Sequence, residues 1–251
     1  MRTTPVVLQD LAERIRALES GRRSQTRTLS LPLLAPLLGG VELSAGSLIE
    51  LLPATPAAGA WTLALLLGLA ATRSLRSGAR GEPHAPLRGL RVAANHMRHL
   101  VLIDPRGDFY PPAMANLGID LERTIIVRPR NRAEAHLALD LSLRCAAVGA
   151  VIGVCDRLRG VESQRLKWAA EAGSGLGVII RQENGPSFAD LRLAVAPLPS
   201  INGKRRVRVD SLRWRGGQEG KTLVLEIDDE TGDVHLSAEL AAAAMAASGG
   251  A

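Results

Sequence analysis

Hydrophobic residues in the middle of the chain form short continuous runs, separated by longer stretches with helical periodicity. Continuous runs are typical of strands buried on both faces, and the stretches between them are long enough to be covering helices. Strands are predicted at residues 48–52, 100–104, 124–127, 150–155 and 176–181. Helices are predicted at about residues 62–75, 111–116, 132–145 and 162–172. This alternation predicts an α/β fold with a mostly parallel central sheet flanked by helices.

The pattern changes after residue 186. Apolar and charged residues alternate at 189–195, 206–214 and 222–227, which is typical of strands with one solvent-facing side. These strands predict an antiparallel extension of the sheet at its C-terminal side. Beyond them an Ala-rich helix is expected at 237–247. Residues 76–89, rich in Pro, Gly and Arg, are expected to form a loop inserted in the α/β part.

The N-terminal segment has an amphipathic pattern of its own. Four apolar residues recur at three- and four-residue spacing, which predicts a separate helix over residues 6–18. They are Leu8, Leu11, Ile15 and Leu18. A basic, polar linker at 20–28 follows, so this helix must bury its apolar stripe either on its own domain or on a neighbouring copy or partner. We therefore divide the chain into residues 1–28, an α/β core at 29–236 and a C-terminal helix and tail at 237–251.

The chain carries a net charge of +6, and its basic residues are nearly all arginine. The charge is compatible with a nucleic-acid or acidic partner, whereas the arginine bias is also what a GC-rich genome produces. Lys204, Arg206 and Arg208 would share one face of a strand. This strip is a candidate for weak contact with DNA phosphates, although charged residues also protect ordinary edge strands.

Cysteine and histidine spacing gives no sign of a metal site, disulfide or nucleophile. Cys145 and Cys155 lie in apolar runs and are expected to be buried thiols, and no Cys/His pairing argues for a nucleophile. We expect no bound metal and no cofactor. The chain also shows no signal peptide, and its longest apolar stretch, 63–71, is far below the roughly 20 residues that span a bilayer. A cytoplasmic protein with no membrane partner is predicted.

Residues 46–64 have the outline of a strand, a phosphate-binding loop and a helix start. A working loop ends in Gly, Lys and then Ser or Thr, which bind the phosphates and Mg²⁺. If Gly59 is that glycine, Ala60 stands in place of the lysine and Trp61 in place of the hydroxyl residue, with Thr62 after it. The scaffold of a phosphate loop is present, but its cation and its metal ligand are missing.

The order of these segments resembles the RecA superfamily and, within it, the ImuA group of RecA/SulA-like proteins encoded with mutagenic translesion synthesis factors. The stretch Leu102-Ile-Asp-Pro-Arg-Gly-Asp-Phe-Tyr-Pro-Pro is similar to a RecA strand and the helix after it. Its Phe-Tyr-Pro-Pro piece, and Leu166-Lys-Trp-Ala-Ala-Glu-Ala-Gly, are similar to ImuA proteins in particular. The resemblance covers about residues 46–228.

The resemblance assigns roles in nucleotide hydrolysis to particular positions, and only some of these positions carry the expected residue. Arg106 stands where the glutamate that activates water is expected, and an arginine cannot accept a proton from water. Asp156 matches the Mg²⁺-associated aspartate, and Gln182 matches the glutamine that senses the γ-phosphate, after Arg181 in place of an asparagine. The two loops that carry DNA in RecA are short here, which argues against a filament with DNA along its axis.

The resemblance implies a non-catalytic accessory protein of error-prone translesion DNA synthesis. Its implied partners are an ImuB-like inactive Y-family polymerase, an error-prone C-family DNA polymerase and RecA, with homo-oligomers open. Two alternatives remain. One is a nucleotide- or DNA-binding RecA paralogue that mediates recombination. The other is a SulA-like cell-division inhibitor, against which the basic linker and C-terminal extension argue mildly.

Overall fold

The computed structural model describes residues 28–56, 58–74, 98–217, 219–228 and 231–237. The predicted helix over residues 6–18, with Leu8, Leu11, Ile15 and Leu18, lies outside the described residues. So do the predicted loop at 76–89 and almost all of the predicted helix at 237–247. The proposed division of the chain at residues 28 and 237 falls at the limits of the described ranges and stays a prediction.

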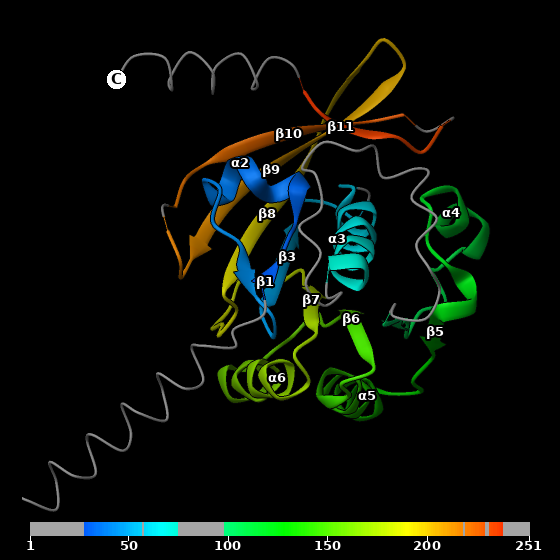
Figure 1. Cartoon of the computed structure of the whole chain (residues 1–251), viewed down its shortest axis with the longest axis vertical. Coiled ribbons are helices and arrows are strands. Elements are labelled where there is room, and N and C mark those ends of the chain that lie inside the picture. Colours follow the sequence, from blue (N-terminus) through cyan, green and yellow to red (C-terminus); the bar gives the residue numbers. More distant parts are fainter. Residues whose placement is uncertain (1–27, 57, 75–97, 218, 229–230, 238–251) are drawn as a thin grey trace, which may run out of the picture.

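A nine-stranded sheet, counted over the described residues, forms the centre of the molecule (Figure 1). Its order is β11-β10-β9-β8-β3-β7-β6-β4-β5. The half from β3 to β5 is parallel throughout, as the continuous apolar runs predicted. Its strands are β3 (Leu48–Pro53), β4 (His99–Ile103), β5 (Thr124–Val127), β6 (Val148–Val154) and β7 (Leu176–Ile180).

Helices cover both faces of the parallel half. On β3, Leu48 and Ile49 belong to different core clusters because successive side chains of a strand point to opposite faces. One face packs under α3, and α5 and α6 lie side by side over the other (Figure 1). The helices are α3 (Ala60–Ser74), α4 (Pro111–Asn116), α5 (Arg132–Arg144) and α6 (Gly160–Gly173). The predicted arrangement of a sheet between helical layers is confirmed.

The antiparallel extension is also confirmed, with one strand more than expected. Its strands are β8 (Leu191–Ile201), β9 (Lys204–Trp214), β10 (Thr222–Ile227) and β11 (Val234–Leu236). β8 runs parallel to β3, and each later strand is antiparallel to the one before it. Asn202 and Gly203 both have positive φ, 52° and 75°, and form the tight turn of the β8–β9 hairpin. An Asn-Gly pair is a strong hairpin signal, and it makes both strands longer than their alternation suggested.

The sequence pattern did not predict the elements that precede β3. They are β1 (Thr28–Leu29), the 3₁₀ helix η1 (Pro32–Leu34), α2 (Ala35–Leu38) and β2 (Leu43–Ser44). Leu29, Leu34 and Leu37 are fully buried and extend the core cluster that contains α3. These pieces are too short for periodicity to identify, because their conformation depends on the α3 side of the sheet that they cover.

Candidate functional site

The loops after β3, β4, β6 and β7 meet at one edge of the sheet, because parallel strands place their carboxyl ends together. This edge is where open α/β sheets bind ligands. The predicted vestigial nucleotide-site residues come from these four loops and from the first turn of α3: Gly59, Ala60, Trp61, Thr62, Arg106, Asp156 and Gln182. The topology therefore brings the segments together, and the contacts within them decide what the edge can bind.

The loop after β3 packs against the protein itself. Ala58, Gly59 and Ala60 are buried, so no cation lies where the lysine of a phosphate loop would be. Gly59 has φ of +84°, and a Cβ there would lie 2.7 Å from Cγ2 of Val207 on β9. The backbone N–H of Ala54 donates to the Val195 carbonyl of β8 at 2.8 Å. The centre of this loop is therefore a tight contact with the antiparallel strands.

Trp61 fills part of the space beside this loop. Its half-buried indole packs on the core and meets the ring of Phe109 edge-on, with 4.5 Å between ring centroids and 75° between ring planes. Such aromatic pairs contribute about 0.5–1.5 kcal/mol beyond their buried area. Thr62 lies next to it in the first turn of α3 and is half-buried. The position expected for a metal-binding hydroxyl is thus occupied by an aromatic contact.

A buried aspartate, which the sequence analysis did not single out, places Phe109. Asp104 is 1% exposed, and its carboxylate accepts the backbone N–H groups of Gly107, Asp108 and Phe109 at 2.9, 3.0 and 3.2 Å. These bonds hold the loop after β4 against the start of α3. The signal in the sequence was an aspartate ending an apolar strand, followed by Pro and Gly.

Arg106 and Asp156 form an ion pair across the sheet edge. Nη2 of Arg106 lies 2.8 Å from Oδ2 of Asp156, and both side chains are about half exposed. A pair this exposed adds at most about 1 kcal/mol to stability. Its effect on the chemistry of this edge is larger than its effect on stability, because the Asp156 carboxylate, which was expected to serve a metal, is bound to a guanidinium. Within the described ranges, no group of three or more His, Cys, Asp or Glu residues could hold a metal ion.

Arg181 and Gln182 differ in burial and in hydrogen bonding. Gln182 is exposed, and the structure gives its side chain no hydrogen bond to another described residue. Arg181 is buried and binds Glu50 on β3, with Nη1 3.2 Å from each carboxylate oxygen. It also donates to the carbonyls of Leu158 and Pro186, at 3.3 and 3.2 Å. Arg181 thereby connects the loops after β6 and β7 to the central strand.

Glu50 is a structural residue that sequence reasoning missed. It is completely buried and also accepts from Nε of Arg192 at 3.0 Å. A carboxylate in the middle of the apolar run 48–52 was the available signal. Buried charges require partners, and here two arginines provide them, one directly after β7 and one in β8. The connections after β6 and β7 are confirmed as short, at residues 155–159 and 181–190.

Cys155 is buried as expected, whereas Cys145 is exposed, so the expectation of two buried thiols was wrong for Cys145. The sequence also contained no sign of a contact that Cys155 makes with a histidine. Sγ of Cys155 lies 3.0 Å from Nε2 of His136, and Nδ1 of His136 lies 3.7 Å from Oε1 of Glu162. The two residues come from α5 and the end of β6, which only the packing of α5 on the sheet brings together. Burial raises the pKa of the Cys155 thiol to about 11, and burial also lowers the pKa of His136. Both groups are neutral near pH 7, so the thiol is no activated nucleophile.

The basic strip of Lys204, Arg206 and Arg208 lies on β9 as predicted. By strand alternation it lies on the face of β9 that is turned away from the buried Val207. Two of its three residues face acidic neighbours. Nε of Arg208 lies 3.0 Å from Asp210, and Nε of Arg206 lies 3.9 Å from Glu226. Contact of this strip with nucleic acid stays a prediction, and these pairings reduce the positive charge that it would present.

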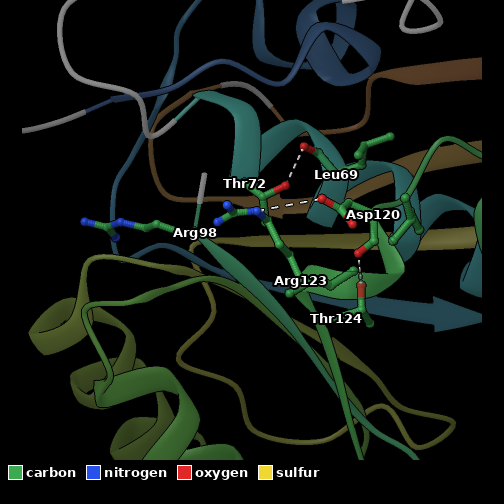
Figure 2. A pocket seen from close by; sticks show the side chains of 8 residues that line it. Leu69, Thr72, Arg98, Asp120, Arg123 and Thr124 are labelled. Atoms are coloured by element: carbon green, nitrogen blue, oxygen red, sulfur yellow. Dashed lines mark hydrogen bonds and ion pairs between the residues drawn. The ribbon is translucent and has the colours of Figure 1, made fainter. Parts of the chain in front are cut away.

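The cavity drawn in Figure 2 is a packing defect beside α3. It encloses about 10 Å³, which is room for roughly one water molecule. Thr72 closes one side by donating to the Leu69 carbonyl at 2.9 Å, and Thr124 donates to the Asp120 carbonyl at 2.7 Å (Figure 2). This cavity cannot hold a nucleotide.

Comparison with known proteins gives three findings. No protein-family model matches the chain. Over 140 residues, the chain is 29% identical to the protein ImuA of Caulobacter vibrioides, with the same result for strains NA1000/CB15N and ATCC 19089/CB 15. The match covers 48% of this chain and 57% of the ImuA length, so the chain spans little more than half of these relatives.

The crystal structure of the RadB recombinase superposes with a TM-score of 0.57 at 17% sequence identity, covering 81% of this chain and 97% of that one. This likeness confirms the predicted RecA-like fold. The match to ImuA also agrees with the predicted resemblance to the ImuA group. Among the described residues, the helices are too short or too polar to cross a bilayer.

Proposed function

We propose that this chain is a non-catalytic, RecA-like accessory protein of error-prone translesion DNA synthesis. The similarity to ImuA supports the pathway, and the RecA-like fold supports the scaffold. The observation that carries the non-catalytic part is the Arg106–Asp156 ion pair. At the sheet edge where a nucleotide would react, the expected base is a cation and the expected metal carboxylate is bound to it.

The phosphate side of the same edge supports this proposal. A phosphate loop needs free backbone N–H groups and a lysine that faces the phosphates. Here Gly59 contacts Val207, the methyl of Ala60 is buried, and the Trp61 ring meets the Phe109 ring edge-on. Binding of Mg·ATP would require these contacts to separate and would still find no cation at the lysine position.

Without nucleotide chemistry, the fold would serve to present binding surfaces to other proteins. By its resemblance to ImuA, the chain would act with an ImuB-like inactive Y-family polymerase, an error-prone C-family polymerase and RecA at the nucleoid. The shortened loops after β6 and β7, held by buried Arg181, leave no long segment at this edge to surround DNA. Scaffolding therefore fits better than filament formation on DNA.

The first experiment measures binding and hydrolysis of Mg·ATP by the purified full-length chain, with an active RecA-family ATPase as control. We expect no saturable binding at millimolar ATP and no turnover above the buffer rate. Stoichiometric binding with turnover would overturn the non-catalytic assignment. Binding of single-stranded DNA in a salt series is measured in parallel, and a steep loss of affinity with salt would favour the recombination-mediator alternative instead.

The second experiment tests the pathway in a strain that lacks the gene. We expect damage-induced mutagenesis to fall on deletion and to recover fully with the Arg106→Ala/Asp156→Ala variant, because neither side chain performs chemistry. Unchanged mutagenesis on deletion would remove the translesion role. Recovery with the natural chain but not with the variant would show that this edge of the sheet is functional.

A further inference from the structure

The outer faces of α5 and α6 form an exposed apolar surface, which we call the α5–α6 face. It consists of Leu137 and Leu141 on α5 and of Val161 and Trp168 on α6, each between 52% and 79% exposed. Spacings of four and seven residues put each pair on one side of its helix. The two helices lie side by side on the sheet (Figure 1), and their N-terminal ends follow β5 and β6 at the edge described above. Exposed large apolar side chains gathered on two neighbouring helices indicate a candidate interaction site.

A hollow between the two helices gives this face a shape that a partner can enter. It has a volume of about 230 Å³, against roughly 30 Å³ for a water molecule in the liquid, and Leu137 and Leu166 line it together with polar residues. The guanidinium groups beside it are already paired. Arg144 and Arg165 both bind Asp140, and Arg132 binds Glu162. Because these charges are compensated, the hollow presents no excess positive charge that would favour a polyanion.

The described chain begins close to this face. Thr28 lies opposite Ser44 in the β1–β2 pair, and the backbone N–H of Gly46 donates to the carbonyl of Gly175, just after α6. Nζ of Lys167 on α6 also lies 3.1 Å from the carbonyl oxygen of Gly46. Thr28, at which the N-terminal segment joins the core, therefore lies across the β1–β2 pair from the segment that contacts the C-terminal end of α6, although β1 itself packs on the α3 side of the sheet.

The length of the linker lets the N-terminal segment reach the whole face. Residues 19–27 are nine residues, which extend to about 30 Å at roughly 3.3 Å per residue. α6 has 14 residues and is about 21 Å long at ~1.5 Å per residue. As a helix, the stripe from Leu8 to Leu18 would measure about 15 Å, against about 10 Å from Val161 to Trp168.

We propose that residues 6–18 dock on the α5–α6 face of the same chain through Leu8, Leu11, Ile15 and Leu18. The apolar stripe can be buried only against an apolar surface, and the exposed apolar side chains of the α5–α6 face can be buried only by an apolar partner. The attachment at Thr28 makes the encounter intramolecular, so a short linker raises the effective concentration to about millimolar. The docked segment hides the face, and a partner that binds either surface would have to displace the other. This inference is independent of the proposed function.

The experiment is a cysteine cross-linking test on the full-length chain. In a Cys145→Ser background, Ile15→Cys is combined with Leu141→Cys or with Trp168→Cys and treated with a short bismaleimide. Cys155 can remain, since its thiol is buried and has a raised pKa of about 11. The products are separated by denaturing gel, and the linked peptides are identified by mass spectrometry. Intramolecular cross-links are expected, with a yield independent of protein concentration.

Two controls separate docking from random encounters of a tethered segment. The pair Ile15→Cys with Ile201→Cys places the second thiol at the exposed end of β8, far along the sheet from α6. Adding Leu11→Asp to an experimental pair puts a charge into the stripe. We expect at least a fivefold loss of cross-linking in both controls. Yields equal to either control would overturn the proposal, as would cross-linked dimers that increase with concentration, because they would show docking on a second copy.

Discussion

Replacing Glu50 by glutamine tests whether the buried ionic cluster holds the loops of the candidate site in place. Glu50 and Arg181 are 0% and 1% exposed as side chains, and the carboxylate also binds Arg192. Glutamine keeps the size of the side chain and removes its charge. Two guanidinium groups would then share a neutral amide, with one of them in a site that water does not reach.

The expected cost follows from this geometry. Two unit charges about 4 Å apart attract each other by roughly 4 kcal/mol at an effective dielectric constant of 20. Removing one member of a buried pair typically costs about 3–5 kcal/mol, because the remaining charge stays buried without its partner. We expect Glu50→Gln to lower the free energy of unfolding by about this amount. A part of the loss would be recovered in Glu50→Leu/Arg181→Met, since that variant leaves a smaller uncompensated charge.

Urea unfolding followed by circular dichroism measures this loss as a lower midpoint at unchanged m-value. Glu183→Gln is the matched control, because Glu183 pairs with Arg157 and both side chains are mostly exposed. The control should cost less than about 1 kcal/mol. A cost below about 1 kcal/mol for Glu50→Gln as well would refute the argument that the cluster is a buried, energetically coupled unit.

Three further predictions concern single residues. Burial lowers the pKa of His136, so the folded chain binds its proton more weakly than the unfolded chain does. Stability should therefore fall as pH drops through about 6.5. The change of the urea midpoint between pH 7.5 and pH 5.5 should be smaller in His136→Gln. Gly59→Ala should cost about 1–3 kcal/mol in thermal or urea unfolding, because its φ is positive and the new methyl meets Val207 at 2.7 Å; a neutral effect would contradict the tight packing of this loop. A thiol reagent at pH 8 should modify Cys145 rapidly and Cys155 only after denaturation, and two equally fast thiols in the native chain would refute the buried environment of Cys155.

Periodicity was sufficient to predict the core because hydrophobic patterning is a local property of the chain. The continuous apolar runs predicted all five strands of the parallel half, and β5 at Thr124–Val127 and β10 at Thr222–Ile227 have the expected bounds. Parallel strands also place their carboxyl ends at one edge, so the four site loops could be grouped in advance. The short elements before β3 were missed because they have no period of their own, and their conformation follows from the surface that they cover.

The candidate site depends on partners that are distant along the chain. The residue type alone shows that Arg106 cannot act as a base. Only the fold shows that its ion partner is Asp156, which is 50 residues away along the chain and 2.8 Å away in space. The same holds for Glu50 and Arg181, which are 131 residues apart, and for Cys155 with His136. Residue types and periods predict which strands form and which side chains stand at the expected site positions. Loop packing and burial then decide which charges meet, because ion-pair energies depend on distance and solvent access rather than on sequence order.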